Sequence, residues 1–508
     1  MNPPQASSVS GSARLIAKGA GVVFLGTAVG SVLRYVFQVI AARGLGAEAF
    51  GLWTLGFIIF KIAAMGAEFG LPQGVVRYVA AFRSDGRAAE VRGVVRSGKI
   101  LALSSGFSAA LLALVLAAPV SVIGFHRPET AALIRLFALA LPFTTMTTVL
   151  LSVTQGYKTM VPTMAVREFF EPLFRLLLVT GMFFLGLRLT GATLAYVVAA
   201  AGAMLLAWAA VRRLDPVSAF RAAAAPGGTR LLLSFGWPLF LLQLMAFTIQ
   251  WTGTILLGIF RSPAEVGVYG AAVKTALLGS LSRNAFYSIF SPIVAEMDSQ
   301  GRLESMGRTY RTVSKWVFSV NFPLFLGLVI FGRPVLRLFG GEFARGGAPL
   351  AMLAVGWVVY SSVGPVGETL IMTGRQRLHL LNMSGGFAAN LILSFLLVPY
   401  YGAFGAAAAF SISMILYDVA AIIQVRFLVG IRPFPRTLWK PAVAGLLASG
   451  IVSVGHLVPA LGPMYDKLAA GLAGGAVFAM LYAGFLLLFG LDEEDRRILA
   501  QIKSRIVP

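Results

Sequence analysis

The sequence predicts an all-α polytopic membrane protein with about 14 transmembrane helices, arranged as two parallel-repeat six-helix bundles plus two C-terminal helices. Three observations lead to this fold class: the composition, a series of long apolar runs, and an internal repeat. Of 508 residues, 58% are hydrophobic and only 12% are charged. Soluble domains carry roughly 25% charged residues, so the composition indicates a lipid environment.

The excess of basic residues has a topological explanation. The formal net charge is +22, but nucleic-acid-binding proteins gather their Lys and Arg on a polar domain, and no segment here is polar enough. The basic residues fall instead in short breaks between apolar runs, as expected for cytoplasmic loops. We therefore expect no nucleic acid partner, anionic membrane lipids near the basic loops, and both termini in the cytoplasm. The chain has no cysteine, which excludes disulfides and cysteine metal ligands.

The apolar runs are long enough to be counted as membrane spans. A spanning helix needs about 20 largely apolar residues. Arg14 and Lys18 precede the first run without a convincing cleavage site, so we expect a retained helix rather than a signal peptide. The fourteen expected spans are 15–42, 48–70, 97–119, 131–154, 162–187, 190–211, 231–259, 264–290, 312–332, 346–373, 378–399, 402–427, 438–458 and 466–490.

Short motifs recur in the two halves of the chain. ARLIAKG (13–19) resembles TRLLLSFG (229–236), and AEAFGLW (47–53) resembles AEVGVY (264–269). Two further pairs share the same offset of about 211 to 218 residues: QGYK (155–158) with TGRQ (373–376), and GATLAYVVAA (191–200) with GAFGAAAAFS (402–411). Six spans per repeat preserve orientation, so the repeats should be parallel and enclose a cavity between two bundles.

This repeat predicts the domain organisation. The expected segments are a flexible N-terminus (1–13), an N-lobe (14–211), a cytoplasmic linker (212–230), a C-lobe (231–427), two extra transmembrane helices (428–490) and a cytoplasmic amphipathic tail (491–508).

Motifs for catalysis, cofactors or metals are poor. GVVRSGK (93–99) resembles half of a phosphate-binding loop, but Ile100 replaces the Ser or Thr that binds magnesium, and a membrane helix follows. His126, His379 and His456 lie in separate breaks and predict no metal cluster. We expect no enzyme activity, no cofactor and no metal.

Charged residues inside the spans are the candidate functional residues, because each is costly when exposed to lipid and therefore faces a cavity or a partner. The candidates for a substrate cavity are Arg34, Lys61, Glu68, Glu171, Arg175, Lys274 and Asp418. Arg77, Arg283 and Glu368 are inner-side charges for which snorkelling to the interface is an equally good interpretation.

The stretch VREFFEPLFR (166–175) places four charges and a proline inside one span. The apolar run that follows it, 176–187, would span about 18 Å as a helix, which is short of the roughly 30 Å hydrocarbon core. The charged stretch must therefore form the inner part of the span. We expect Arg167 and Glu168 at the inner edge of the membrane, and Glu171 and Arg175 as an interior pair one helical turn apart.

Four segments carry a resemblance to a known family: LGAEAFGLWTL (45–55), VGVYGAAVK (266–274), FSPIVAEMDSQGRLESMGRTYR (290–311) and RPVLRLFGGEFARGGAPLAMLAVG (333–356). In their order and spacing, over nearly the whole chain, the sequence resembles the Wzx-like polysaccharide flippases of the multidrug/oligosaccharidyl-lipid/polysaccharide (MOP) exporter superfamily. The resemblance implies two six-helix lobes forming a V, with two extra helices. It also implies transfer of an undecaprenyl-pyrophosphate-linked oligosaccharide from the inner to the outer leaflet.

The leading hypothesis is therefore a flippase in a bacterial inner membrane, with an O-antigen, capsule or exopolysaccharide unit as its substrate. A polysaccharide polymerase and glycosyltransferases would be its functional partners. One alternative is an ion-coupled small-molecule antiporter, which would need mainly acidic residues in its spans. Another is a membrane polymerase or ligase, which would need a sizeable outer loop with catalytic residues.

Overall fold

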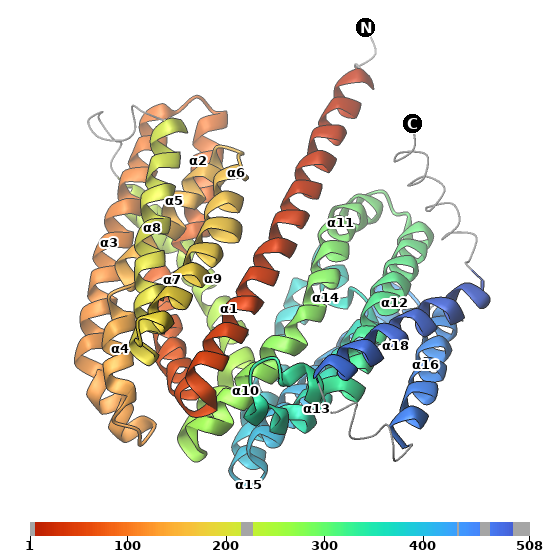
Figure 1. Cartoon of the computed structure of the whole chain (residues 1–508). Coiled ribbons are helices and arrows are strands. Elements are labelled where there is room, and N and C mark those ends of the chain that lie inside the picture. Colours follow the sequence, from red (N-terminus) through yellow and green to blue (C-terminus); the bar gives the residue numbers. More distant parts are fainter. Residues whose placement is uncertain (1–5, 215–226, 434–435, 458–467, 491–508) are drawn as a thin grey trace, which may run out of the picture. The chain divides into compact units, whose positions relative to one another are not determined.

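The computed structural model describes residues 6–214, 227–433, 436–457 and 468–490, and these ranges contain helices and no strand (Figure 1). The all-α fold class is confirmed. The chain divides into two compact units, Met1–Gly270 and Ala271–Pro508. Each unit is described by itself.

Where it is described, the first unit consists of nine helices, two π-helical segments and the start of a tenth helix. The helices are α1 (Ala6–Glu68), α2 (Leu71–Ser84), α3 (Ala88–Pro119), α4 (Thr130–Ala138), α5 (Leu141–Gly156), α6 (Val161–Thr163), α7 (Glu171–Phe184), α8 (Leu189–Leu214), α9 (Gly228–Phe260) and α10 (Pro263–Ala276); the π-helices are η1 (Val120–Gly124) and η2 (Met164–Phe170).

The second unit begins within α10 and is also helical where it is described. Its elements are η3 (Leu277–Gly279), α11 (Ser280–Ser299), α12 (Leu303–Leu336), η4 (Gly341–Gly346), α13 (Gly347–Val363), α14 (Val366–Met372), α15 (Gln376–Gln424), η5 (Val425–Val429), η6 (Arg436–Leu438), α16 (Trp439–Leu457) and α18 (Leu468–Leu488).

Two of the longest helices are each interrupted by a glycine. Gly46 in α1 has a φ of 77°, and Gly402 in α15 has a φ of 54°. Residues with a side chain rarely adopt positive φ, so glycine suits both positions. Gly46 lies between the first and second predicted spans, and Gly402 is the first residue of the twelfth. Each of these helices therefore supplies two spans.

The other ten predicted spans coincide with one helix or with a series of consecutive helical segments. Span 131–154 is formed by α4 and α5, which meet at an angle of 41°. Among the described residues, seven continuous helical stretches are long and apolar enough to cross a membrane, or eight if α4 and α5 are counted as one span. Two of the seven stretches contain α1 and α15, which hold two predicted spans each.

A helix outside the fourteen spans follows the second one. At the end of the second predicted span, where the sequence reads GLPQG (70–74), Phe69 and Gly70 both have positive φ. Pro72 then lies in the first turn of α2, where its missing N–H costs nothing. The chain thus breaks its helix and starts a new one, and Arg77 lies on that new helix.

Helix α9 packs differently from the lobe division that the repeat predicts. The predicted C-lobe starts at residue 231, yet α9 contacts α1, α2 and α3 within the first unit. A Cβ at Gly236 would overlap the carbonyl oxygen of Phe69, and one at Gly228 would crowd the carbonyl oxygen of Gly93. Small residues allow helices to approach backbone to backbone. Packing therefore assigns α9 to the first unit, whereas similarity assigns it to the second repeat.

The structure describes the ends of the chain only in part. Helix α1 begins at Ala6, within the segment expected to be a flexible lead, because no proline or glycine run stops a helix from extending N-terminally from the apolar span. The predicted amphipathic tail, 491–508, lies outside the described residues, as does most of the predicted linker.

The first unit has apolar side chains both in its buried core and on its exposed surface. An interior cluster joins α2, α3, α5, α8 and α9, with Val75, Leu150 and Leu232 fully buried. On α3, Phe107 and Leu111 are each more than half exposed although both are apolar. A contiguous apolar outer surface of this kind suits lipid rather than water. The exposure pattern therefore agrees with a membrane-spanning bundle.

The close approach of α1 and α10 yields a stability prediction. A Cβ at Gly51 would overlap the carbonyl oxygen of Pro263, whereas Gly66 on the same helix has open space. We expect Gly51→Ala to destabilise the protein by about 1–3 kcal/mol, because the backbone must move to admit the methyl group. Gly66→Ala serves as the matched control and should leave stability unchanged or slightly raised.

Thermal unfolding in detergent micelles, followed by loss of monomer on size exclusion, measures both variants. Equal melting temperatures for Gly51→Ala and the wild type would show that this helix crossing tolerates a side chain.

Candidate functional site

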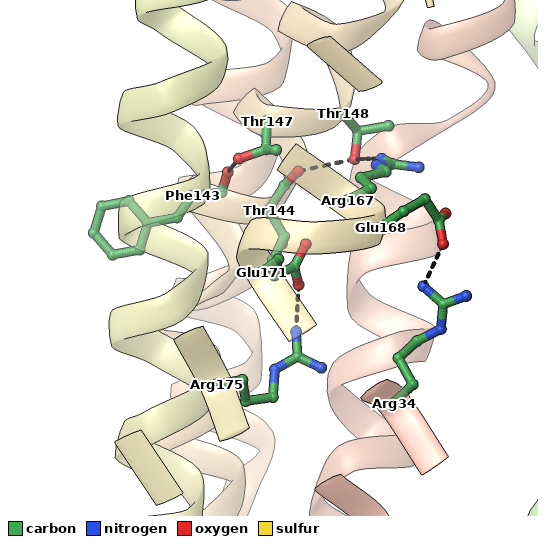
Figure 2. A network of polar contacts seen from close by, with 9 residues as sticks. All are labelled: Arg34, Phe143, Thr144, Thr147, Thr148, Arg167, Glu168, Glu171 and Arg175. Carbon is green, nitrogen blue, oxygen red and sulfur yellow. Dashed lines mark hydrogen bonds and ion pairs between the residues drawn. The ribbon is translucent and has the colours of Figure 1, made fainter. Parts of the chain in front are cut away.

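Three carboxylates and three arginines form a polar network inside the first unit. The acids are Glu68, Glu168 and Glu171, and the bases are Arg34, Arg167 and Arg175; they come from α1, η2 and α7, and Thr148 of α5 links two of them. Figure 2 shows Arg34 directed at Glu168, Arg175 at Glu171 and Arg167 at Thr148. With all six groups ionised, the network is electrically balanced.

A proline explains why the acids and bases of VREFFEPLFR face this network. Pro172 has no N–H, so the carbonyl of Glu168 loses its ordinary helical donor. The backbone widens into the π-helix η2, where the N–H of Glu171 donates to the carbonyl of Val166, five residues back. Such π-bulges occur frequently at functional sites. On and directly after this wider turn, Arg167 contacts Thr148, Glu168 contacts Arg34, and Glu171 contacts Arg175.

The ion pair between Arg34 and Glu168 joins α1 to η2. Nη1 of Arg34 lies 2.8 Å from Oε2 of Glu168, and Nη2 donates to the Ser31 hydroxyl at 2.9 Å. The Arg34 side chain is 41% exposed, against 15% for Glu168. Gly30 makes the contact possible, because a Cβ there would overlap the Glu168 carboxylate and main chain. Arg34 therefore presents an accessible face while Glu168 holds it from the protein side.

Arg167 is connected to Glu68 through a hydroxyl. Its Nη2 donates to Oγ1 of Thr148 at 2.6 Å, and that Oγ1 lies 2.9 Å from Oε1 of Glu68 and 2.9 Å from the carbonyl oxygen of Thr144. A hydroxyl has one hydrogen and two acceptor positions. Thr148 can therefore donate either to Glu68 or to the backbone while it accepts from Arg167.

Glu171 and Arg175 form the interior pair that their spacing predicts. Arg175 donates from Nη2 to Oε1 of Glu171, one turn earlier on the helix. Its guanidinium also lies over the Tyr196 ring, 4.0 Å from the centroid, and 5.6 Å from that of Phe37. Its buried Nε has no hydrogen-bond partner among the described residues. The pair is thus held by one ion contact and by two aromatic faces.

Lys61 lies on the same aromatic surface as Arg175. Its Nζ is 5.4 Å from the Phe57 centroid and 6.0 Å from that of Phe60. The Phe60 and Tyr196 rings are 5.2 Å apart and nearly perpendicular. Lys61 and Arg175 are therefore two cations on one aromatic cluster, which is consistent with the interior position predicted for both.

In the second unit, Arg283 of α11 stands among tyrosines. It hydrogen-bonds to the Tyr360 hydroxyl, and its guanidinium lies 4.6 Å from the Tyr360 ring centroid and 5.5 Å from that of Tyr287. Glu368 is in the first turn of α14, and Lys274 is half-buried in the last turn of α10.

Asp418 of α15 is the most deeply buried charged candidate. Its side chain is fully buried, and neither carboxylate oxygen has a hydrogen-bond partner among the described residues. An unpaired buried carboxylate is costly as an ion. Asp418 therefore stands out as a residue whose position is not explained by packing.

Some residues of these clusters are not evident from the sequence. The sequence analysis places Arg167 and Glu168 at the inner membrane edge and assigns them no partners, yet they contact Thr148 and Arg34. Pro172, four residues after Glu168, was the available signal. Thr148, Asn321 and Tyr360 carry no charge that would single them out, although Asn321 links Ser282 at 2.6 Å to Ser361 at 3.1 Å. Arg77 lies 5.0 Å from the Phe235 centroid. Within the described ranges, no three His, Asp or Glu side chains converge as metal ligands would.

Comparison with known sequences relates the chain to polysaccharide assembly. A family described as polysaccharide biosynthesis protein matches residues 16–297, more than half of the chain. The probable flippase AglR of Haloferax volcanii is 25% identical over 232 residues, which are 45% of this chain and 46% of AglR. The capsular polysaccharide biosynthesis protein CapF of Staphylococcus aureus is 28% identical over 153 residues, 29% of this chain and 38% of CapF. The matches to AglR and CapF thus each cover less than half of this chain and less than half of the relative.

Comparison with solved structures establishes the fold. The lipid II flippase MurJ in an inward closed conformation superposes with a TM-score of 0.67 and 14% identity, over 92% of this chain and 98% of MurJ. An inward-facing multidrug resistance MATE family transporter of the MOP superfamily gives 0.67 and 15%, over 79% and 94%. These structures confirm the predicted fold, and the family match confirms the predicted relation to polysaccharide biosynthesis proteins.

The Glu171–Arg175 pair provides a test of the interior network. We expect Arg175→Met to lower the melting temperature clearly, because it leaves a buried carboxylate without its partner. Adding Glu171→Gln should recover part of the loss, with a coupling energy of about 0.5–3 kcal/mol in a double-mutant cycle.

The matched control is the same cycle on Arg87 and Glu90, an exposed ion pair three residues apart. Its coupling should be close to zero because water screens exposed pairs. Equal coupling in the two cycles would contradict the interior position of Arg175.

Proposed function

Because the chain belongs to the family of polysaccharide biosynthesis proteins, we propose that it is a transporter that flips a lipid-linked oligosaccharide across the membrane. The substrate is a sugar unit of an O-antigen, capsule or exopolysaccharide on undecaprenyl pyrophosphate, and it moves from the inner to the outer leaflet. The protein acts without chemical conversion of the substrate. It lies in a bacterial inner membrane with both termini in the cytoplasm.

The observation that carries the proposal is the arginine-rich network inside an apolar helical unit. A pyrophosphate head cannot cross hydrocarbon without counter-charge, and the guanidinium group matches phosphate oxygens with two parallel donors. Arg34 is the best placed to meet such a head, since 41% of its side chain is exposed.

Transport follows from alternating access in this proposal. The two repeated lobes rock about a central cavity, and the polyprenyl tail remains in the bilayer while the head passes. Glycosyltransferases on the cytoplasmic side supply the substrate, and a polysaccharide polymerase on the far side consumes it. Consumption of the product or an ion gradient supplies the work.

An ion-coupled exporter of small molecules is the second candidate. Asp418 favours it, because a buried carboxylate without hydrogen-bond partners suits the binding and release of a proton or cation. Export of a cationic dye from inverted vesicles, driven by a proton or sodium gradient and abolished by Asp418→Asn, would support this candidate.

Reconstitution tests the flippase proposal directly. Vesicles contain the purified protein and an undecaprenyl-pyrophosphate-linked oligosaccharide, and a membrane-impermeant lectin reports the sugar that reaches the opposite leaflet. We expect Arg34→Ala and Arg175→Ala to lower the initial rate about 10-fold or more, because a hydrogen bond to a charged group contributes about 1.5–3 kcal/mol. Lys61→Ala should lower the rate as well.

Arg87→Ala is the matched control, since Arg87 is an exposed arginine paired only at the surface. It should transport at the wild-type rate. Wild-type rates in Arg34→Ala, Arg175→Ala and Lys61→Ala together would refute a role of the network in substrate binding.

A further inference from the structure

The arginines of the network already have anionic or polar partners. Glu168 occupies Arg34, Glu171 occupies Arg175, and Thr148 connects Arg167 to Glu68. The sequence predicts a cationic site, but among these six groups the charges balance. A pyrophosphate that bound beside this network would add negative charge to three carboxylates in an apolar unit. That arrangement is costly unless an arginine changes its partner.

We propose that Glu168 is a built-in counter-anion that the substrate's diphosphate displaces from Arg34, so that Glu168 sets how readily the head group is released. The inference rests on the proposed function and deepens it by assigning a specificity-determining residue to the same site. Glu68, acting through Thr148, has the corresponding role for Arg167.

The geometry of Arg34 suits an exchange of partners. Its two contacts, to Glu168 at 2.8 Å and to the Ser31 hydroxyl at 2.9 Å, use two of its five N–H donors. Its side chain is far more exposed than that of Glu168. A diphosphate approaching from the exposed side therefore finds donors available before the existing ion pair breaks. Replacing one anion by another keeps the guanidinium paired throughout.

The position of Glu168 allows it to compete continuously with a diphosphate for Arg34. Its carboxylate lies against Gly30, in a space that any Cβ at residue 30 would fill. The π-helix η2 holds its backbone on the same side. Glu168 therefore remains close to Arg34 after displacement and can reclaim it. A site with unopposed arginines would bind a diphosphate more tightly but release it more slowly.

Thr148 allows the second exchange at low cost. When Arg167 turns towards a phosphate, the Thr148 hydroxyl keeps the backbone carbonyl of Thr144 or Glu68 as an acceptor, both at 2.9 Å. No buried hydroxyl loses its last partner in this change. Arg167 can thus be released without leaving an unsatisfied donor.

The test compares affinity with turnover in the full chain reconstituted in lipid nanodiscs and vesicles. The binding probe is farnesyl diphosphate, and turnover is measured with the undecaprenyl-pyrophosphate-linked oligosaccharide. We expect Glu168→Gln to bind farnesyl diphosphate at least about fivefold more tightly, as removal of a competing ligand does. Its maximal transport rate should fall, because release becomes slower. Farnesyl monophosphate should gain less affinity than the diphosphate.

Three further variants allow the test to be interpreted even if Glu168→Gln does not fold. Glu168→Asp shortens the side chain and should shift both quantities in the same direction, and Glu68→Gln should do so while retaining its hydrogen bond from Thr148. If Glu168→Gln misfolds, these two variants carry the measurement. Glu90→Gln, which removes an exposed acid outside the network, should match the wild type.

Two results would overturn the inference. Folded Glu168→Gln with weaker or unchanged diphosphate affinity would show that Glu168 supports Arg34 rather than competes for it. Tighter binding together with an undiminished transport rate would show that release does not depend on Glu168. Failure of the proposed function itself differs from both, because then the wild type neither binds farnesyl diphosphate nor moves the glycolipid.

Discussion

The cost of placing a charge in an apolar helical protein underlies the arrangement of the first unit. Arg34 and Arg175 belong to helices whose neighbours are almost all hydrophobic, so each needs an anion or an aromatic face within reach. Pro172 meets this need indirectly. By removing one backbone donor it widens the helix into η2, and the widened turn brings Glu168 to Arg34. The π-helical turn therefore places a carboxylate beside Arg34, and it also positions residues of the candidate site.

Close packing of helices depends on a second constraint, because lipid offers no hydrophobic incentive for helices to associate. Glycines supply the missing contact by letting backbones touch. The repeated motifs 47–53 and 264–269 illustrate this: Gly51 packs against the carbonyl of Pro263, and Gly267 packs against the carbonyl of Ala47. Two segments that resemble each other in sequence therefore meet in a reciprocal contact. Their likeness therefore reflects a shared packing role.

The balance of charge in the network bears on how the proposed flippase would bind an anionic head group. An interior rich in arginine suggests a simple attraction for an anionic head group, yet the described contacts pair most of that charge internally. Attraction alone would favour binding and hinder release. In the proposed exchange of partners, competing carboxylates would bring binding and release closer in free energy, as repeated turnover requires.

The sequence alone determined the all-α fold class, the order of the long apolar runs and the Glu171–Arg175 pair, because apolar length and helical spacing are local properties. The tertiary structure decided the rest. It joined Arg34 to Glu168, 134 residues apart, through a π-helix that ordinary helical spacing does not predict. It also packed α9 against the first unit, although internal similarity places that helix in the second repeat. Such contacts depend on which helix faces pack together. A single sequence shows which faces are apolar or charged, but not which helix each face packs against.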